Sequence, residues 1–271
     1  MTSQDFTGCA IAELFDQALT NARVDPVLQS DDYWMYVRAL HLRSDQAGFE
    51  RAVSLCSDTD PLVRAVGADV LAQLGTHNGI EGYPFADQSA PVLISLLRDT
   101  DSRVIASALY ALGHLKRGES AELVAFVEHP SQDVRCALAY TLGSRSDDLA
   151  CGALVILSAD QDLDTRNWAT FGLGTLYERD STVIREALVT RLSDNNDEVR
   201  GEAMLGLARR QDVRAAGAIL TELGREDVLN LAIEAAKEMP LSEFLPRLEQ
   251  LLAAHPDDED IKRAVERCRL A

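Results

Sequence analysis

DTDPLVRAVGADVLAQLG, residues 58–75, contains the phrase that decides the fold: an acidic turn, a Val-Arg pair, small residues and a closing Leu-Gly. The phrase recurs in residues 99–113, 131–143, 160–174 and 194–208. Weaker copies follow the acidic residues at 31–32, 226–227 and 257–260. Self-similarity at a period of this length is the signature of a repeat protein.

The valine of each phrase, or the residue in its place, serves as an anchor for comparing the repeats. These anchors stand at positions 33, 63, 104, 134, 165, 199, 228 and 261. Each repeat contains two helical patterns, one that ends before the acidic turn and one that begins near the anchor. From the anchor, small and apolar residues recur at +4, +7, +8 and +11, which lie on one face of a helix.

The residue three places before the anchor is of a helix-capping type in the five strong copies: Asp60, Asp101, Ser131, Asp162 and Asn196. Such side chains accept backbone N–H bonds at a helix N-terminus, and a carboxylate there also meets the positive end of the helix dipole. The sequence therefore predicts an all-α fold, a right-handed α-solenoid of about eight two-helix repeats. We expect a single domain over 1–271, with degenerate capping repeats at 1–45 and 240–271 and an insertion loop at 76–89.

The phrase resembles the short HEAT-like repeats of the phycobilisome lyases, in which Val-Arg opens the second helix and Ala, Leu and Gly close it. The resemblance covers nearly the whole chain from about Asp31 and is strongest over 58–210. In that family the recurring arginine usually pairs with acidic groups of adjoining turns. The resemblance thus implies a structural ladder of Arg64, Arg135, Arg166 and Arg200, interrupted at Ile105 and Leu229. Anion binding by the four arginines is the alternative.

The net charge of the chain indicates which class of partner molecule it can bind. The chain has 26 Lys+Arg and 44 Asp+Glu, a net charge of −18. A field of this sign repels phosphate backbones and anionic lipids, so we expect no nucleic-acid or membrane partner. A protein or peptide partner, in particular a basic one, fits better, although the acidity could serve solubility alone. The oligomeric state stays open.

Cysteine usage and the chain's start favour the cytoplasm. Five widely spaced cysteines without a Cys-x-x-Cys motif suggest neither a disulfide framework nor a zinc site. The first sixteen residues lack a basic start before an apolar run, so no secretory signal is predicted.

A row of large side chains marks the candidate binding surface. At about 100° per residue, position +6 lies nearly opposite the apolar face of the second helix. A partner-binding concave face is predicted because exposed aromatic clusters mark interaction sites. Packing of the rings against neighbouring repeats is the alternative. The predicted contact residues are Tyr110, Tyr140, Phe171 and Leu205 at +6, Trp168 at +3, His114 and Arg209 at +10, and the nearby acid Glu202; Asp69 and Glu178 are further acids beside the row.

No catalytic or metal-binding constellation is predicted. The five histidines fall in different repeats, and no His-Glu pair of the kind that binds iron in the HEAT-like deoxyhypusine hydroxylases occurs. Phosphate-loop and nucleophile-elbow motifs are missing as well. We therefore expect a non-enzymatic scaffold, adaptor or assembly factor without a cofactor. The alternatives are a bilin-lyase-like protein that handles a chromophore and an acidic immunity-type inhibitor of a basic toxin.

Overall fold

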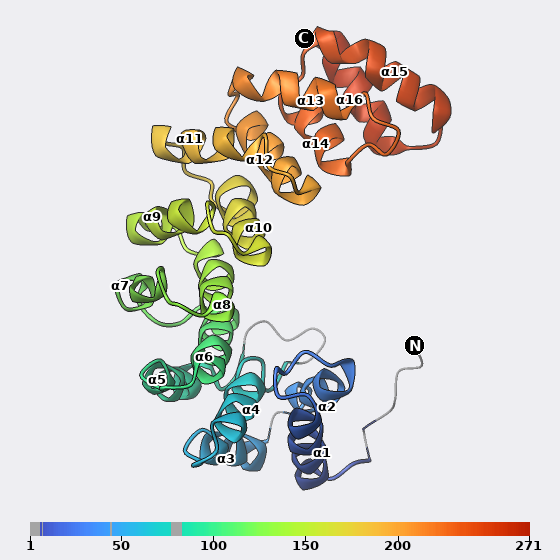
Figure 1. The fold of residues 1–271 in the computed structure, drawn as a ribbon. Coiled ribbons are helices and arrows are strands. Elements are labelled where there is room, and N and C mark those ends of the chain that lie inside the picture. The colour runs from blue at the N-terminus through green and yellow to red at the C-terminus, as the bar shows by residue number, and fades with distance from the viewer. Residues whose placement is uncertain (1–5, 7, 44, 77–82) are drawn as a thin grey trace. The chain divides into compact units, whose positions relative to one another are not determined.

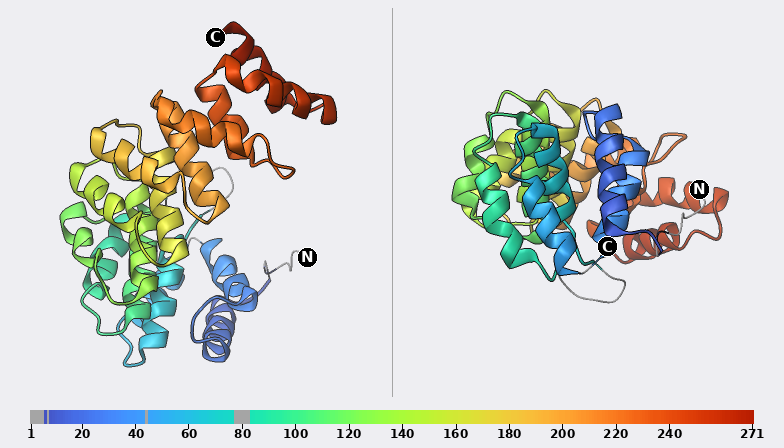
Figure 2. Two further views of the ribbon diagram at one scale, coloured as in Figure 1. Left: turned by 45° about the horizontal axis from the view of Figure 1, so that its top comes forward. Right: turned by 90° about the horizontal axis from the view of Figure 1, so that it is seen from below.

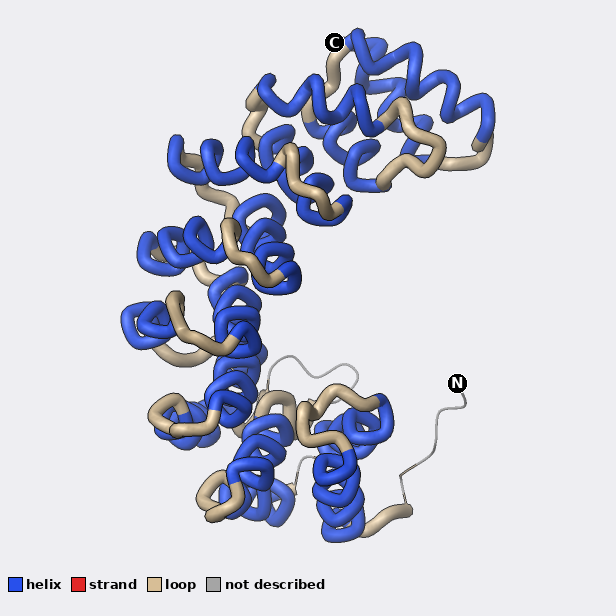
Figure 3. Tube along the Cα trace, in the orientation of Figure 1, coloured by secondary structure: helices blue, strands red, loops and turns tan. Residues whose placement is uncertain are grey.

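The computed structural model describes residues 6, 8–43, 45–76 and 83–271, and every regular element in these residues is a helix (Figure 3). The predicted all-α solenoid fold is thus confirmed at the level of its elements. The chain divides into two compact units, residues 1–141 and 142–271. Figure 2 shows the helices from two further directions. The predicted handedness and the single domain over 1–271 stay predictions.

In the first unit, the first and second helices of the predicted repeats alternate along the chain (Figure 1). The second helices α2, α4 and α6 pack side by side, and the first helices α3 and α5 pack against α4 and α6. The elements are α1 (Ile11–Val24), α2 (Asp31–His41), α3 (Gln46–Leu55), α4 (Pro61–Leu71), α5 (Ala86–Leu96), α6 (Ser102–Leu115), α7 (Ser120–Leu123), the 3-10 turn η1 (Val124–Phe126) and α8 (Gln132–Gly143), which crosses the boundary.

The second unit repeats the pattern. Its second helices α10, α12, α14 and α16 follow one another in contact, and α9 packs against both α10 and α11. The elements are α9 (Asp148–Leu157), α10 (Leu163–Phe171), the π-helical turn η2 (Gly172–Leu176), α11 (Thr182–Arg191), α12 (Asp197–Arg209), η3 (Val213–Ala215), α13 (Ala216–Glu222), α14 (Asn230–Glu238), η4 (Ser242–Phe244), α15 (Leu245–Ala254) and α16 (Glu259–Leu270).

The acidic turns start the second helices as their sequence indicates. The side chains of Asp60 and Asp101 each accept an N–H bond of 2.9 Å from the residue two places on, and Asp162 and Asn196 each accept one from the anchor three places on. The anchors of the strong copies are buried, including Val63, Val104 and Thr165. Capping and burial together fix where these four helices begin and which face they turn inward.

Two predicted positions are wrong. Val228 precedes α14, whose N-cap is Leu229, so the buried anchor of this repeat is Ala232. The predicted insertion loop covers 76–89, but α5 begins at Ala86, so the last four of these positions are helical. Positions 77–82 of that loop lie outside the described residues. The capping roles of 1–45 and 240–271 stay predictions.

Candidate partner-binding site

Trp168 and Phe171 form an exposed aromatic pair on α10. They lie three residues apart, and their ring centroids are 5.9 Å apart with an interplanar angle of 75°, an edge-to-face contact. Trp168 is 38% exposed, whereas Phe171 is half-buried. An edge-to-face pair is a stable arrangement of two aromatic rings. The two rings therefore present a rigid apolar surface to solvent.

Two hydrogen bonds to α12 bracket this pair. Four residues before Phe171, Asn167 Nδ2 donates to Glu198 Oε2 at 2.8 Å. Four residues after it, Thr175 Oγ1 donates to Glu202 Oε2 at 2.6 Å. The segment that carries the two rings is therefore joined to carboxylates of α12 just before Trp168 and again four residues after Phe171.

Burial raises the pKa of Glu202, while the Thr175 hydroxyl and nearby Arg209 lower it. The carboxyl has lost part of its hydration, so a cation placed beside it would interact more strongly than in bulk water. Arg209 is exposed and donates to the Thr175 carbonyl at 3.1 Å. The predicted residues Glu202 and Arg209 thus both contact Thr175, a residue that the repeat pattern does not mark.

A π-helical turn, Gly172–Leu176, carries Thr175. It passes close to α12, because a Cβ on Gly206 would lie 2.5 Å from Gly174 Cα. The Arg210 guanidinium donates to the carbonyls of Leu173 at 2.9 Å and Tyr177 at 2.6 Å, as well as to those of Gly174, Gly206 and Arg179. Arg210 therefore closes the carbonyl end of the turn and ties it to α12.

In the first unit, the predicted residues form a second cluster. The rings of Tyr110 and Tyr140 are 5.4 Å apart, and the His114 ring lies 5.2 Å from Tyr140. The Tyr140 hydroxyl lies 3.1 Å from His114 Nδ1, and Gln73 Nε2 lies 3.3 Å from His114 Nε2. Tyr110, Tyr140 and His114 are half-buried. The structure brings these three together in one unit and Trp168 with Phe171 in the other.

Comparison with known proteins shows the family of this chain. The HEAT-repeat family matches residues 90–174. Protein YibA of Escherichia coli (strain K12) is 31% identical over 240 residues, which cover 86% of this chain and 84% of that protein. This chain belongs to the YibA family of HEAT-repeat proteins. The predicted HEAT-like family is thus confirmed.

Solved structures support the fold of this YibA-family protein. The X-ray structure of Escherichia coli YibA matches 99% of this chain and 100% of that chain, with a TM-score of 0.71 and 26% identity. The HEAT-like repeats protein of Thermococcus onnurineus NA1 matches 96% of this chain and 99% of its own, with a TM-score of 0.52 and 16% identity, which shows the fold alone. The complex of CpcE and CpcF of phycocyanin lyase from Nostoc sp. PCC7120 has a TM-score of 0.46 and 18% identity over 94% and 93% of the chains. That similarity is too low to carry an argument about function.

The prediction that Leu205 is a contact residue of the binding surface is wrong. Its side chain is only 3% exposed, and α12 is buried almost continuously over 203–208 because helices pack on several sides of it. Asp69, the acid expected beside the row, is 5% exposed and accepts a 2.6 Å bond from the Tyr33 hydroxyl. Position +6 therefore faces neighbouring helices in these two repeats.

The arginine ladder has a repeated geometry. Arg64 donates twice to Asp99 of the next repeat, at 2.7 and 2.9 Å, and once to the Asp58 carbonyl of its own turn. Arg200 reaches the Asp194 carbonyl of its own turn and lies 3.9 Å from Glu222. Arg135 donates to the His129 and Pro130 carbonyls. At the predicted interruptions, Ile105 is buried in α6 and Leu229 is the N-cap of α14.

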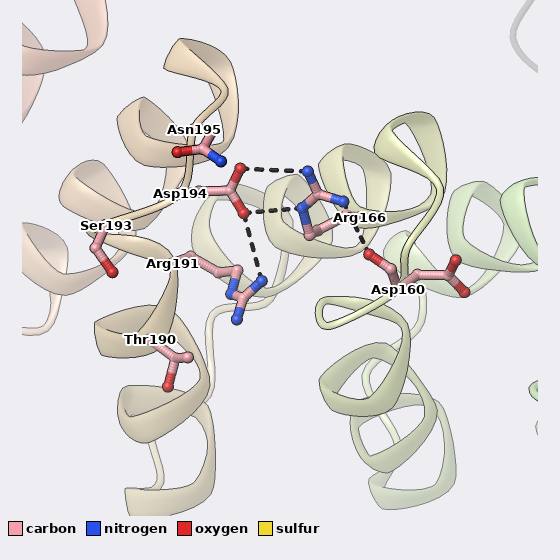
Figure 4. Close-up of a pocket in the computed structure, with 7 residues that line it drawn as sticks. All are labelled: Asp160, Arg166, Thr190, Arg191, Ser193, Asp194 and Asn195. Atoms are coloured by element: carbon pink, nitrogen blue, oxygen red, sulfur yellow. Dashed lines mark hydrogen bonds and ion pairs between the residues drawn. The ribbon is translucent and has the colours of Figure 1, made fainter.

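A groove of about 340 Å³ lies at the Arg166 rung, lined by Asp160, Arg166, Thr190, Arg191, Ser193, Asp194 and Asn195 (Figure 4). Arg166 donates to Asp194 at 2.8 Å and to the Asp160 carbonyl at 2.8 Å, and Arg191 donates to Asp194 at 3.4 Å. Both guanidinium groups point at the same carboxylate, which offsets the positive charge that an anion would need. The geometry favours the structural role over anion binding.

Two titratable groups are buried between α2, α4 and α6. Burial raises the pKa of Asp69 to about 6, against the lowering effect of hydrogen bonds from Tyr33 and Ser107. Burial lowers the pKa of His41 to about 4, and its Nε2 lies 2.8 Å from the Asp69 carbonyl. Folding therefore shifts both groups toward their neutral forms compared with the unfolded chain.

We predict that these two groups have opposite effects on stability between pH 4 and 6.5. His41 binds a proton more readily in the unfolded chain, so its contribution falls as pH falls from 6.5 toward 4. Asp69 loses its proton more readily in the unfolded chain, so its contribution falls as pH rises from about 4 to 6. In Asp69→Asn only the histidine remains, so the free energy of unfolding should fall by roughly 2 kcal/mol as pH falls across this window. In His41→Gln only the carboxyl remains, so the free energy of unfolding should fall by roughly 2 kcal/mol as pH rises across it.

Urea unfolding at a series of pH values measures this. The control is His255→Gln, because His255 is exposed. Parallel pH profiles for Asp69→Asn and His41→Gln would contradict the assignment.

No helix in the described part of the chain combines the length and apolar character needed to cross a membrane. Within the same residues, no group of three or more His, Cys, Asp or Glu side chains is placed to hold a metal ion.

Proposed function

We propose that this HEAT-repeat protein is a non-catalytic interaction scaffold or adaptor, and that its α10–α12 surface binds a segment of a partner protein. One observation carries the proposal: Trp168, in edge-to-face contact with Phe171, is exposed on the second helix α10, whose segment is hydrogen-bonded to two carboxylates of α12. Tryptophan is among the residues that most often dominate binding energy at protein interfaces. The HEAT-repeat fold supports the same reading, because stacked repeats form extended binding surfaces.

The surface is suited to binding because it is already ordered. The rings contact each other, Asn167 and Thr175 are hydrogen-bonded to α12, and Arg210 holds the π-turn. A partner would therefore meet side chains that lose little conformational freedom on binding, which favours affinity. Large aromatic side chains also bury much apolar area for few rotatable bonds.

We expect the double variant Trp168→Ala/Phe171→Ala to lose binding by at least about 30-fold, since two central aromatic anchors are removed. The ligands are peptides selected from a randomised 12-residue phage library on the immobilised wild-type chain. Affinity is measured by anisotropy of labelled synthetic peptides. The control is Ile156→Ala, which removes a 55% exposed apolar side chain from the first helix α9.

Circular dichroism and thermal melting of the variants show whether the fold is retained. The proposal fails if folded Trp168→Ala/Phe171→Ala binds the selected peptides as well as Ile156→Ala does. It also fails if Ile156→Ala loses binding equally, because the binding surface would then include the first helices.

A further inference from the structure

We infer that the partner segment carries a lysine or arginine whose side chain lies along Trp168 and ends beside Glu198 and Glu202. The inference rests on the proposed function and specifies its chemistry. The structural basis is an exposed indole on α10 together with two glutamates of the adjacent helix α12, which receive hydrogen bonds from Asn167, next to Trp168 in the chain, and from Thr175 on the π-turn. The occupant is thus a basic, partly apolar protein segment.

The charges around the rings favour a cation. Glu198, Glu202 and the exposed Asp164, which stands one turn before Trp168, are acidic. Arg209 lies near Glu202, and its guanidinium donates to the Thr175 carbonyl at 3.1 Å. The local balance remains negative, in keeping with the −18 net charge of the chain. An acidic segment or a phosphate backbone would be repelled.

Both carboxylates can accept further hydrogen bonds. The bonds from Asn167 and Thr175 each end on Oε2. A carboxylate has two oxygens and roughly four acceptor positions, so each glutamate can also receive an ammonium or guanidinium group. Glu198 is exposed and Glu202 half-buried, so one is directly accessible and the other is partly desolvated. Partial desolvation strengthens attraction to a cation.

The rings add a second attraction for the same group. A lysine or arginine over an indole face interacts with the electron density of the ring, and tryptophan is the strongest partner of this kind. The aliphatic stem of either residue can also cover apolar surface while the charged end reaches the carboxylates. One long basic side chain therefore satisfies both halves of the surface, which a short apolar residue does not.

The test uses the double variant Glu198→Gln/Glu202→Gln. Glutamine keeps an oxygen that can accept the Asn167 and Thr175 bonds, so the α10–α12 link is preserved while two charges are lost. The control variant Glu226→Gln/Glu266→Gln removes two charges from exposed glutamates elsewhere in the second unit. The probes are a peptide from the phage selection and its version with lysine or arginine replaced by methionine.

We expect selected sequences to be enriched in lysine or arginine next to apolar residues. Glu198→Gln/Glu202→Gln should weaken the basic peptide about 10-fold, and the control variant less than 2-fold, since screening limits distant charges. Replacing the basic residue by methionine should weaken wild-type binding by a similar factor and have little further effect on Glu198→Gln/Glu202→Gln.

The inference is overturned if selected peptides lack basic residues, or if Glu198→Gln/Glu202→Gln binds as tightly as the wild type. Either result would leave the proposed function standing as long as Trp168→Ala/Phe171→Ala abolishes binding. Unchanged binding by that aromatic variant would instead remove the proposed function itself. The two failures are thus distinguishable.

Discussion

Arg210→Met is expected to lower the free energy of unfolding by about 4 kcal/mol, because several buried carbonyls lose a charged donor at once. The Arg210 guanidinium donates hydrogen bonds to the carbonyls of Leu173, Gly174, Tyr177, Arg179 and Gly206. Its side chain is only 6% exposed. Methionine fills part of the space but donates no hydrogen bond. Urea unfolding followed by circular dichroism gives the value.

The adjoining Arg209 offers a matched control. It is exposed and contacts the Thr175 carbonyl at 3.1 Å, so Arg209→Met should cost less than about 1 kcal/mol. Equal losses from the two variants would show that Arg210 does not hold the π-turn. A large loss from Arg210→Met alone would tie the stability of the second unit to the turn that carries Thr175.

Gly206→Ala should lower the free energy of unfolding by about 3 kcal/mol, because the new methyl group has no space. Its Cβ would lie 2.5 Å from Gly174 Cα and 3.0 Å from Leu188 Cδ1. The first neighbour is backbone, so the π-turn and α12 would have to move apart. The helical preference of alanine over glycine, about 1 kcal/mol, offsets only part of this cost. The midpoint of urea unfolding measures the change.

Gly152→Ala provides the opposite result with the same chemical change. Gly152 lies inside α9, and a Cβ there would have nothing within 4 Å. This variant should gain up to about 1 kcal/mol from helix propensity. A stabilised Gly206→Ala would contradict the close approach of the π-turn and α12.

The fold was predictable because local signals and packing agree. Asp60, Asp101, Asp162 and Asn196 cap the helices that their positions indicate, and the anchors after them are buried. The repeat anchored at Val228 shows the limit. There the acids Glu226 and Asp227 precede a helix that begins at Asn230, whose N-cap Leu229 has no side-chain bond. Without a capping side chain, the register is seen only from which residues of α14 are buried, namely Ala232, Ile233, Ala235 and Ala236.

The candidate site was predictable in part. The spacing of Trp168 and Phe171 placed them together because residues three apart share a helix face. Leu205 occupies the same register as Phe171, but helices pack around α12 and bury it, which the pattern of one helix cannot show. The π-turn depends on the bond from Tyr177 N–H to the Gly172 carbonyl at 2.9 Å and on Arg210 from the next repeat. The glycines at 172, 174 and 206 were the available sequence signal.

Fluorescence of a single-tryptophan protein tests the central claim most directly. The chain has two tryptophans, and Trp34→Phe removes the one in α2, which donates to the Leu28 carbonyl, so that emission reports on Trp168 alone. Because Trp168 is exposed, titration with a selected peptide should shift its emission to shorter wavelength. The shift should saturate with the affinity measured by anisotropy of the labelled peptide. Peptide binding by anisotropy with unchanged Trp168 emission would place the partner elsewhere and contradict the account.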